Sequence, residues 1–189
     1  MSHFTALFDA CVLYPAPLRD CLMHLALTDL FRAKWTDEIH DEWIRNVLKH
    51  RPDLTQERLQ RTRNLMNANV RDCLVSGYEN LIPSLTLPDK NDRHVLAAAI
   101  FVGADVIVTY NLSDFPSETL AQYGIEAQHP DEFITYLIDL APSVVCKAAK
   151  RQRMSLKNPP KNVDELLTAY EKQGLFQTVV KLRLHQELL

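Results

Sequence analysis

Glycine and long apolar runs are scarce in this sequence, and each shortage excludes a class of protein. The 189 residues include only 4 glycines, and neither GxGxxG nor GxxxxGK(S/T) occurs. Phosphate binding by a glycine-rich loop is therefore excluded. No apolar run approaches the roughly 18 residues that indicate a membrane-spanning helix. Because 47% of the residues are hydrophobic, the chain can still bury a core, and we expect a folded protein with no membrane association.

Paired cysteines, a secretory signal and a zinc motif are also lacking. The histidines form no HExxH pattern, the cysteines show no CxxC spacing, and the N-terminus has no basic region followed by an apolar run. We therefore expect a cytoplasmic protein whose thiols are reduced and packed in the core. The four cysteines are Cys11, Cys21, Cys73 and Cys146.

Negative charge is in slight excess, with a net charge of −3, but it is unevenly spread. Residues 1–129 hold 12 basic and 17 acidic residues, whereas residues 130–189 hold 9 and 7. Residues 147–161 contain six basic residues and no acidic one, and a second basic stretch covers residues 45–63. Such runs are often only solvated helix faces, yet they also suit the phosphate backbone of a nucleic acid. Arg151, Arg153 and Lys157 are the candidate residues for such binding.

The pattern of apolar residues predicts an α/β fold with a parallel sheet and helices on both faces. Residues 4–8 and 106–109 are short apolar runs typical of buried strands, and residues 125–127 are a weaker strand candidate. Between the strands, apolar residues recur at helical spacing, and Thr36 and Thr55 are suitable N-caps. The predicted helices cover residues 18–31, 36–49, 55–70 and 95–102.

From residue 130 onward the pattern becomes entirely helical. Asn162 and Glu165 have the spacing of a capping box, and Gly174 suits the end of the helix that follows. The sequence therefore predicts an α/β domain over residues 1–129 and a small helical extension over residues 130–189.

Acidic side chains stand where the predicted strands end. Asp9 directly follows the first strand, and Asp114 lies shortly after the second. Because the carboxyl ends of parallel strands open on one crevice, we expect both acids to face it. Asp92 stands at the start of the helix that leads to the second strand, and Glu42 lies on an earlier helix.

Carboxylates gathered in one cleft repel each other and stay ionised together only beside a cation. Their oxygen atoms, with no paired His or Cys nearby, favour Mg²⁺ or Mn²⁺. Such an ion can lower the pKa of a bound water and hold it for attack on a phosphodiester. The pattern thus indicates metal-dependent phosphodiester hydrolysis.

Each acid also has a structural interpretation. Asp89 could cap the alanine-rich helix, which would place Asp92 in its first turn. Asp114 suits a turn, and Glu42 could simply be solvated. Asp9 is different, because an acid next to a buried strand is costly unless it is paired or coordinated.

Three segments together resemble PIN-domain proteins, in particular the VapC-type toxins of bacterial toxin–antitoxin modules. They are LFDACVLYP around Asp9, DKNDRHVLAAA from Asp89, and VIVTYNLSDFP from residue 106. A later stretch, RMSLKNPP from Arg153, resembles the C-terminal extension of one PIN subgroup. The resemblance spans nearly the full chain.

This resemblance implies a three-layer α/β/α fold, a site for Mg²⁺ or Mn²⁺, and single-stranded RNA as the substrate. It also implies a cognate antitoxin protein, which would cover the site with an arginine, and it is compatible with a homodimer. Glu38 and Asp41 are alternatives to Glu42 as the helix acid. The implied catalytic residues are Asp9, Glu42, Asp92 and Asp114, of which Asp9, Asp92 and Asp114 bind the metal, with Asp89, Thr109 and Asn111 in support.

Two other functions compete with RNA cleavage. A catalytically silent PIN module would bind RNA or a protein partner without cutting. A nuclease of the same fold could act on single-stranded DNA. Cleavage assays on both nucleic acids, with wild type and with Asp9→Asn and Asp92→Asn, separate the three hypotheses.

Overall fold

The computed structural model describes residues 4–189, which form two compact units. Unit 1 comprises residues 4–14 and 31–129, and unit 2 comprises Pro15–Leu30 and Pro130–Leu189. The second unit is therefore discontinuous in sequence, because residues 15–30 group with the C-terminal helices and not with the α/β domain. Within residues 4–189, no helix is both long enough and apolar enough to cross a membrane.

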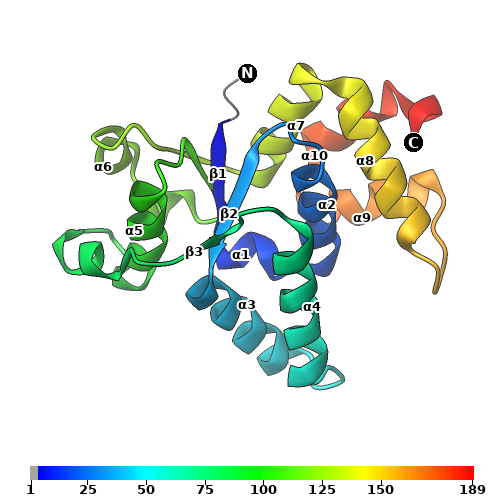
Figure 1. The fold of residues 1–189 in the computed structure, drawn as a ribbon. Helices are drawn as coiled ribbons and strands as arrows, with labels where there is room; N and C mark the ends of the chain where they lie inside the picture. The colour runs from blue at the N-terminus through cyan, green and yellow to red at the C-terminus, as the bar shows by residue number, and fades with distance from the viewer. Residues whose placement is uncertain (1–3) are drawn as a thin grey trace. The chain divides into compact units, whose positions relative to one another are not determined.

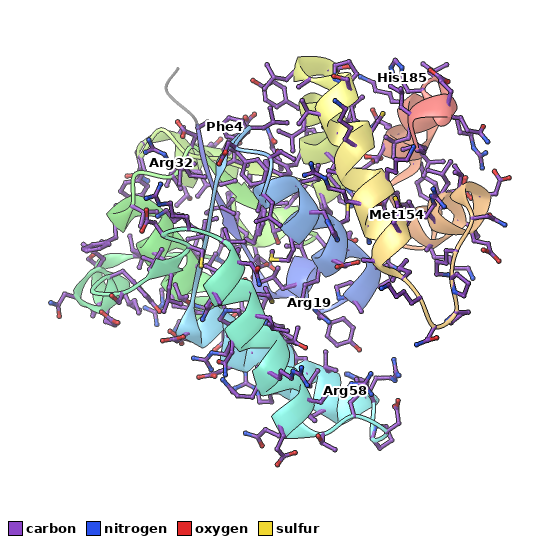
Figure 2. All side chains as sticks on the ribbon, turned by 45° about the vertical axis from the view of Figure 1, so that its right-hand side comes forward. Phe4, Arg19, Arg32, Arg58, Met154 and His185 are labelled. Atoms are coloured by element: carbon purple, nitrogen blue, oxygen red, sulfur yellow. The ribbon has the colours of Figure 1, made fainter. Side chains whose placement is uncertain are left out.

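Unit 1 is built on a five-stranded sheet in the order β3-β2-β1-β4-β5, and all neighbouring strands are parallel. Central strand β1 is buried along its whole length, as expected for a strand covered on both faces. The Arg32 N–H donates to the Phe4 carbonyl at 2.9 Å, where these two residues lie together (Figure 2). The strands are β1 (Thr5–Phe8), β2 (Arg32–Thr36), β3 (Leu74–Val75), β4 (Val106–Val108) and β5 (Glu126–Gln128).

Helices cover both faces of this sheet, which confirms the three-layer α/β/α prediction. Figure 1 shows α5 and α6 on one side and α3 and α4 on the other. The α-helices of unit 1 are α1 (Ala10–Leu13), α3 (Asp37–His50), α4 (Gln56–Asn69), α5 (Arg93–Phe101) and α6 (Ser117–Ala121). Its 3-10 helices are η1 (Glu79–Ser84), η2 (Lys90–Asp92) and η3 (Leu112–Asp114).

The predicted caps of the long helices are present. Thr36 accepts a hydrogen bond from the Ile39 N–H at the start of α3, and Thr55 caps α4 in the same way. The predicted helix over residues 18–31 was wrong at its end, because α2 (Ala16–Ala26) stops five residues earlier. Asp29 adopts a φ of 58°, which a right-handed helix cannot accommodate, and strand β2 follows.

The order of the strands creates a topological switch point in the sheet. From β1 the chain crosses to β2 on one side, whereas β4 pairs with β1 on the other side. Ligands of such sheets bind beyond the carboxyl ends of the strands at this switch point. Asp9 and Thr109 are the first residues after β1 and β4, and they therefore stand at the switch point.

A polar network joins β2, α3 and α4 inside unit 1. The Asn67 side-chain oxygen accepts from the Trp35 indole at 2.7 Å and lies 2.9 Å from His40 Nε2. His40 Nδ1 accepts from the Trp43 indole at 3.0 Å. Because that indole can only donate, the fully buried His40 is neutral with its proton on Nε2.

Unit 2 is entirely helical, and α2 packs on α8 and α9. Gln152 is buried at its centre, where it donates to the Pro17 carbonyl at 3.1 Å and accepts from the Tyr170 hydroxyl. The predicted capping box of Asn162 and Glu165 is present. With α2, the elements are α7 (Pro130–Leu140), α8 (Pro142–Ser155), α9 (Val163–Glu171), α10 (Phe176–Arg183) and η4 (Gln186–Leu188).

Candidate active site

Asp9 is held at the end of β1 by three donors. Its Oδ1 accepts from the Ala10 N–H at 2.6 Å. Its Oδ2 accepts from the Thr109 hydroxyl at 2.7 Å and from the Cys11 thiol at 3.0 Å. All three donors are neutral, so the carboxylate is fixed in orientation without an ion-pair partner among these contacts.

The environment of Asp9 disfavours its ionised form. The residue is 3% exposed, and this burial raises the pKa of the carboxyl above its ordinary value. The hydrogen bonds from Cys11 and Thr109 act in the opposite direction, while the charge of Glu42 raises the pKa further. A cation beside Asp9 would relieve both the burial and the repulsion.

The pKa of Asp92 is affected by several other acids. Asp92 stands at the junction of η2 and α5, and its side chain does not cap α5. Asp89 instead caps η2 by accepting from the Asn91 N–H at 2.8 Å. Burial, followed by the charges of Asp9, Asp89, Asp114 and Glu42, raises the pKa of Asp92 to about 7. Each of these four acids therefore disfavours the ionised form of Asp92 through its charge.

The acids of α3 separate into two groups. Asp37 and Asp41 both bind the Arg63 guanidinium, so Asp41 is engaged in an ion pair with α4. Glu42 lies 3.6 Å from His94 Nε2, and Glu38 lies 3.7 Å from His94 Nδ1. Glu42 also raises the pKa of both Asp9 and Asp92, and Glu38 is not among the causes of either shift.

The remaining predicted residues lie in the loop after β4. Asp114 ends η3 and is half-buried, whereas Asn111 is exposed. The Asn111 N–H donates to the Thr109 hydroxyl at 3.0 Å. Since that hydroxyl donates to Asp9, the buried Thr109 links the loop to the end of β1 and supports Asp9 directly.

Sequence reasoning missed two side chains in this cleft. Cys11 was expected to be a core thiol, but it donates to Asp9 and accepts from the Tyr110 N–H at 3.2 Å. Burial raises the pKa of Cys11, so it remains a protonated donor. The second missed side chain is His94. In the sequence, only the positions of Cys11 and His94, two residues after Asp9 and two residues after Asp92, indicate that they could belong to the site.

His94 is buried against the acids of α3. Burial alone would lower the pKa of its imidazole, but the neighbouring carboxylates of Glu42, Glu38 and Asp9 outweigh it, so the pKa is raised. Its Nδ1 is buried and has no hydrogen-bond partner among the described residues. The Glu38 carboxylate at 3.7 Å is therefore a charge contact and not a hydrogen bond.

The donor set fits a hard cation such as Mg²⁺ or Mn²⁺, because it consists of carboxylate oxygens. The raised pKa of Asp92 is compatible with such an ion, since burial and then the charges of neighbouring acids disfavour the ionised carboxyl. Within residues 4–189, however, no three His, Cys, Asp or Glu side chains already meet as a metal site. An ion would therefore have to draw these carboxylates closer together.

The predicted RNA-binding residues all belong to unit 2, but they differ in their contacts. Arg151 and Lys157 are exposed. Arg153 is only half-exposed, and its guanidinium donates to the carbonyls of Lys161 and Leu189 at 3.4 and 3.3 Å. These contacts give Arg153 a structural role within unit 2.

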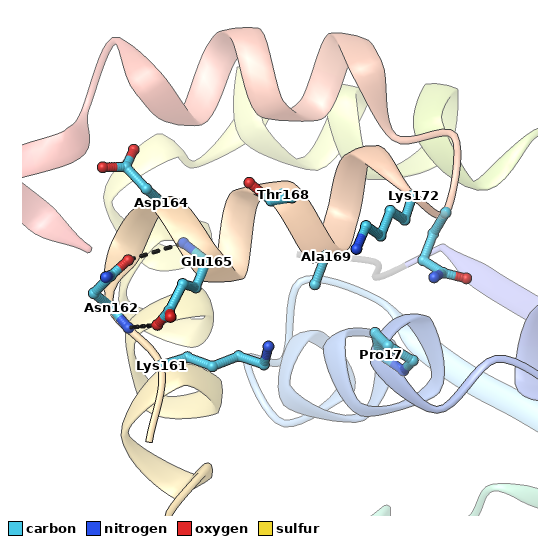
Figure 3. A pocket seen from close by; sticks show the side chains of 9 residues that line it. Pro17, Lys161, Asn162, Asp164, Glu165, Thr168, Ala169 and Lys172 are labelled. Carbon is cyan, nitrogen blue, oxygen red and sulfur yellow. Dashed lines mark hydrogen bonds between the residues drawn. The ribbon is translucent and has the colours of Figure 1, made fainter. Parts of the chain in front are cut away.

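A groove of about 460 Å³ lies beside α9 in unit 2. Figure 3 shows the side chains of Lys161 and Lys172 extending along it. The two acids that line the groove have other partners: Glu165 completes the capping box of α9, and Asp164 accepts from Arg183 at 3.1 Å. The groove is therefore lined by two ammonium groups and two carboxylates, and of these carboxylates Asp164 has a cationic partner in Arg183.

Comparisons with known proteins match both parts of the chain. Residues 5–113 match a family described as "PIN domain", and residues 130–184 match one described as "VapC50 C-terminal domain". Over 64 residues, the chain is 50% identical to a Mycobacterium tuberculosis protein named "Putative ribonuclease VapC50". This stretch covers 34% of the chain and 37% of that relative, which is little more than a third of the relative's length. No solved structure matches the chain.

Proposed function

We propose that this chain, which belongs to the PIN-domain family, is a divalent-metal-dependent endoribonuclease and the toxin of a toxin–antitoxin pair. The observation that carries the proposal is the carboxylate cluster beyond β1 and β4, where burial and neighbouring acids raise the pKa of Asp92 to about 7. The family match and the name of the mycobacterial relative support hydrolysis of RNA.

In this proposal, Asp9 and Asp92 hold the metal ion, Asp114 completes its ligands, and Glu42 adds the fourth negative charge of the cluster. A bound Mg²⁺ or Mn²⁺ would supply a water of lowered pKa and positive charge beside the phosphate. Cys11 and Thr109 keep the Asp9 carboxylate in one orientation through their hydrogen bonds to Oδ2.

Binding of the RNA backbone is assigned to basic side chains of unit 2. Arg151 and Lys157 are exposed and available for phosphates. Lys161 and Lys172 of the groove extend this set. A cognate antitoxin would occupy the acidic cleft of unit 1 with an arginine, because a guanidinium pairs with carboxylates in bidentate fashion.

The proposal is tested by cleavage of single-stranded RNA in Mg²⁺ or Mn²⁺, with single-stranded DNA in parallel. We expect Asp9→Asn and Asp92→Asn each to lower the cleavage rate by about 100-fold or more, as loss of one preorganised electrostatic group does in other active sites. Chelation of the metal should abolish cleavage. Glu118→Gln is the matched control, since it removes an exposed carboxylate of α6.

Cleavage that persists in both Asp variants would identify a contaminating nuclease and refute the site. RNA binding without cleavage by wild type would indicate a catalytically silent module. Faster cleavage of DNA than of RNA would reassign the substrate.

A further inference from the structure

His94, on α5, contacts two acidic residues of α3. It lies in the first turn of α5, two residues after Asp92, and its side chain is only 7% exposed. Its two ring nitrogens face two carboxylates one turn apart on α3, with Nε2 at 3.6 Å from Glu42 and Nδ1 at 3.7 Å from Glu38. Residues four apart on a helix lie on one face, so a single imidazole can serve both.

Glu42 is the acid on which this contact would act most directly. Its side chain is 32% exposed and has flexible torsions, and the charges of Asp9 and Asp92 repel it. A cationic group or an N–H donor beside such a carboxylate favours its ionised form. In either neutral tautomer, His94 presents an N–H toward one of the two glutamates, and its protonated form presents one toward each.

We propose that His94 is a positioning residue that holds Glu42 beside Asp9 and Asp92. Glu42 can then act with these two acids on a divalent cation, while Glu38 contacts the other ring nitrogen of His94. This inference rests on the proposed function, because it concerns the same site. The buried Nδ1, which has no hydrogen-bond partner among the described residues, faces the Glu38 carboxylate at 3.7 Å.

The alternative is that His94 only fills space between α3 and α5. His94→Phe tests this directly, since it keeps a ring of similar size and removes both nitrogens. His94→Gln restores a side-chain N–H donor. His50→Phe, at the exposed end of α3, is the matched control for the introduction of a phenyl ring.

The main readout is the affinity of the full chain for Mn²⁺, measured by calorimetry in the absence of RNA. We expect His94→Phe to weaken Mn²⁺ binding by about 10- to 100-fold, the range found when partners of metal ligands are removed. His94→Gln should recover most of this loss. Because both residues act together, adding Glu42→Gln to His94→Phe should cause little further loss.

Unchanged Mn²⁺ affinity in His94→Phe would overturn the positioning role, and so would losses from His94→Phe and Glu42→Gln that simply add. If His94→Phe does not fold, the comparison of His94→Gln with the double variant His94→Gln/Glu42→Gln applies the same additivity criterion. A wild-type chain that binds no Mn²⁺ would instead overturn the proposed function itself, so the two failures can be told apart.

Discussion

The acids around Asp9 in unit 1 and two acids of unit 2, Asp131 and Asp139, differ in their partners. Unit 1 contains 11 Lys and Arg against 15 Asp and Glu, whereas unit 2 contains 10 against 9. In unit 1, Asp9 and Asp92 are crowded by other carboxylates, and the pKa of each is raised. In unit 2, Asp131 accepts two N–H groups at the start of α10, and Asp139 pairs with Lys181. The two acids of unit 2 thus have donors or a cation beside them, whereas Asp9 and Asp92 have other carboxylates nearby.

The largest effect is expected on the free energy of unfolding, from substitutions in the polar network inside each unit. Asn67→Ala removes the acceptor of Trp35 and His40 in unit 1, and Gln152→Ala removes the acceptor of Tyr170 in unit 2. An unsatisfied buried donor costs about 1–3 kcal/mol, so each variant should lower the free energy of unfolding by roughly this amount, measured in urea.

The control for these variants is Asn64→Ala, since Asn64 is exposed on α4. A change below about 0.5 kcal/mol in the network variants, as for ordinary surface substitutions, would show that the networks do not stabilise their units. Two separate unfolding transitions, one sensitive to each variant, would sharpen the comparison by showing that the units unfold independently.

A smaller effect is expected on the salt dependence of RNA binding. Lys161→Ala and Lys172→Ala should each reduce the slope of log K against log salt by about 0.7 if each lysine contacts one phosphate of a single strand. Fluorescence anisotropy of an RNA oligomer in EDTA measures this without cleavage. Lys181→Ala is the matched control, because Lys181 is already paired with Asp139. Equal slopes in all variants would remove the groove from the RNA path.

The smallest effect concerns pH and stability without metal. The pKa of Asp92 is about 7 in the folded chain, whereas its ordinary value, which we take for the unfolded chain, is 3.8. Between these values the folded state binds a proton that the unfolded state has lost, so the contribution of Asp92 to stability falls as pH rises through this window. In EDTA, the melting temperature of wild type should therefore fall more between pH 5 and pH 8 than that of Asp92→Asn.

Added Mg²⁺ should raise the melting temperature of wild type more at pH 8 than at pH 5, because the ion binds the deprotonated carboxylates. If the melting temperatures of wild type and Asp92→Asn have the same pH dependence, the pKa of Asp92 is not raised in the folded chain.

Sequence reasoning was most successful where a local pattern has one structural meaning. Thr36, Thr55 and Asn162 cap helices as their spacing indicates. Strand β2 was missed because its apolar residues follow directly on those of the preceding helix, and β3 was missed because two residues carry too little pattern. The helix over residues 176–183 also escaped, because its outer face is itself apolar, with Phe176 64% exposed.

Within the candidate site, the positions of acids after strands could be predicted, but their partners could not. The Arg63–Asp41 ion pair depends on the packing of α4 against α3, and the Glu42–His94 contact depends on where α5 lies. Likewise, Arg153 belongs to a basic run in the sequence, and only the fold shows that its guanidinium binds chain carbonyls.

The place of α2 in unit 2 has a consequence for synthesis of the chain on the ribosome. Helix α2 ends at residue 26, but α8, on which it packs, begins at Pro142. At roughly 5–20 residues per second, α2 waits on the order of ten seconds for this partner. Its apolar side, with Leu18, Leu22 and Leu25 buried in the finished fold, is exposed to chaperones or to aggregation during that time, and a chain cut at residue 129 would remain in that state.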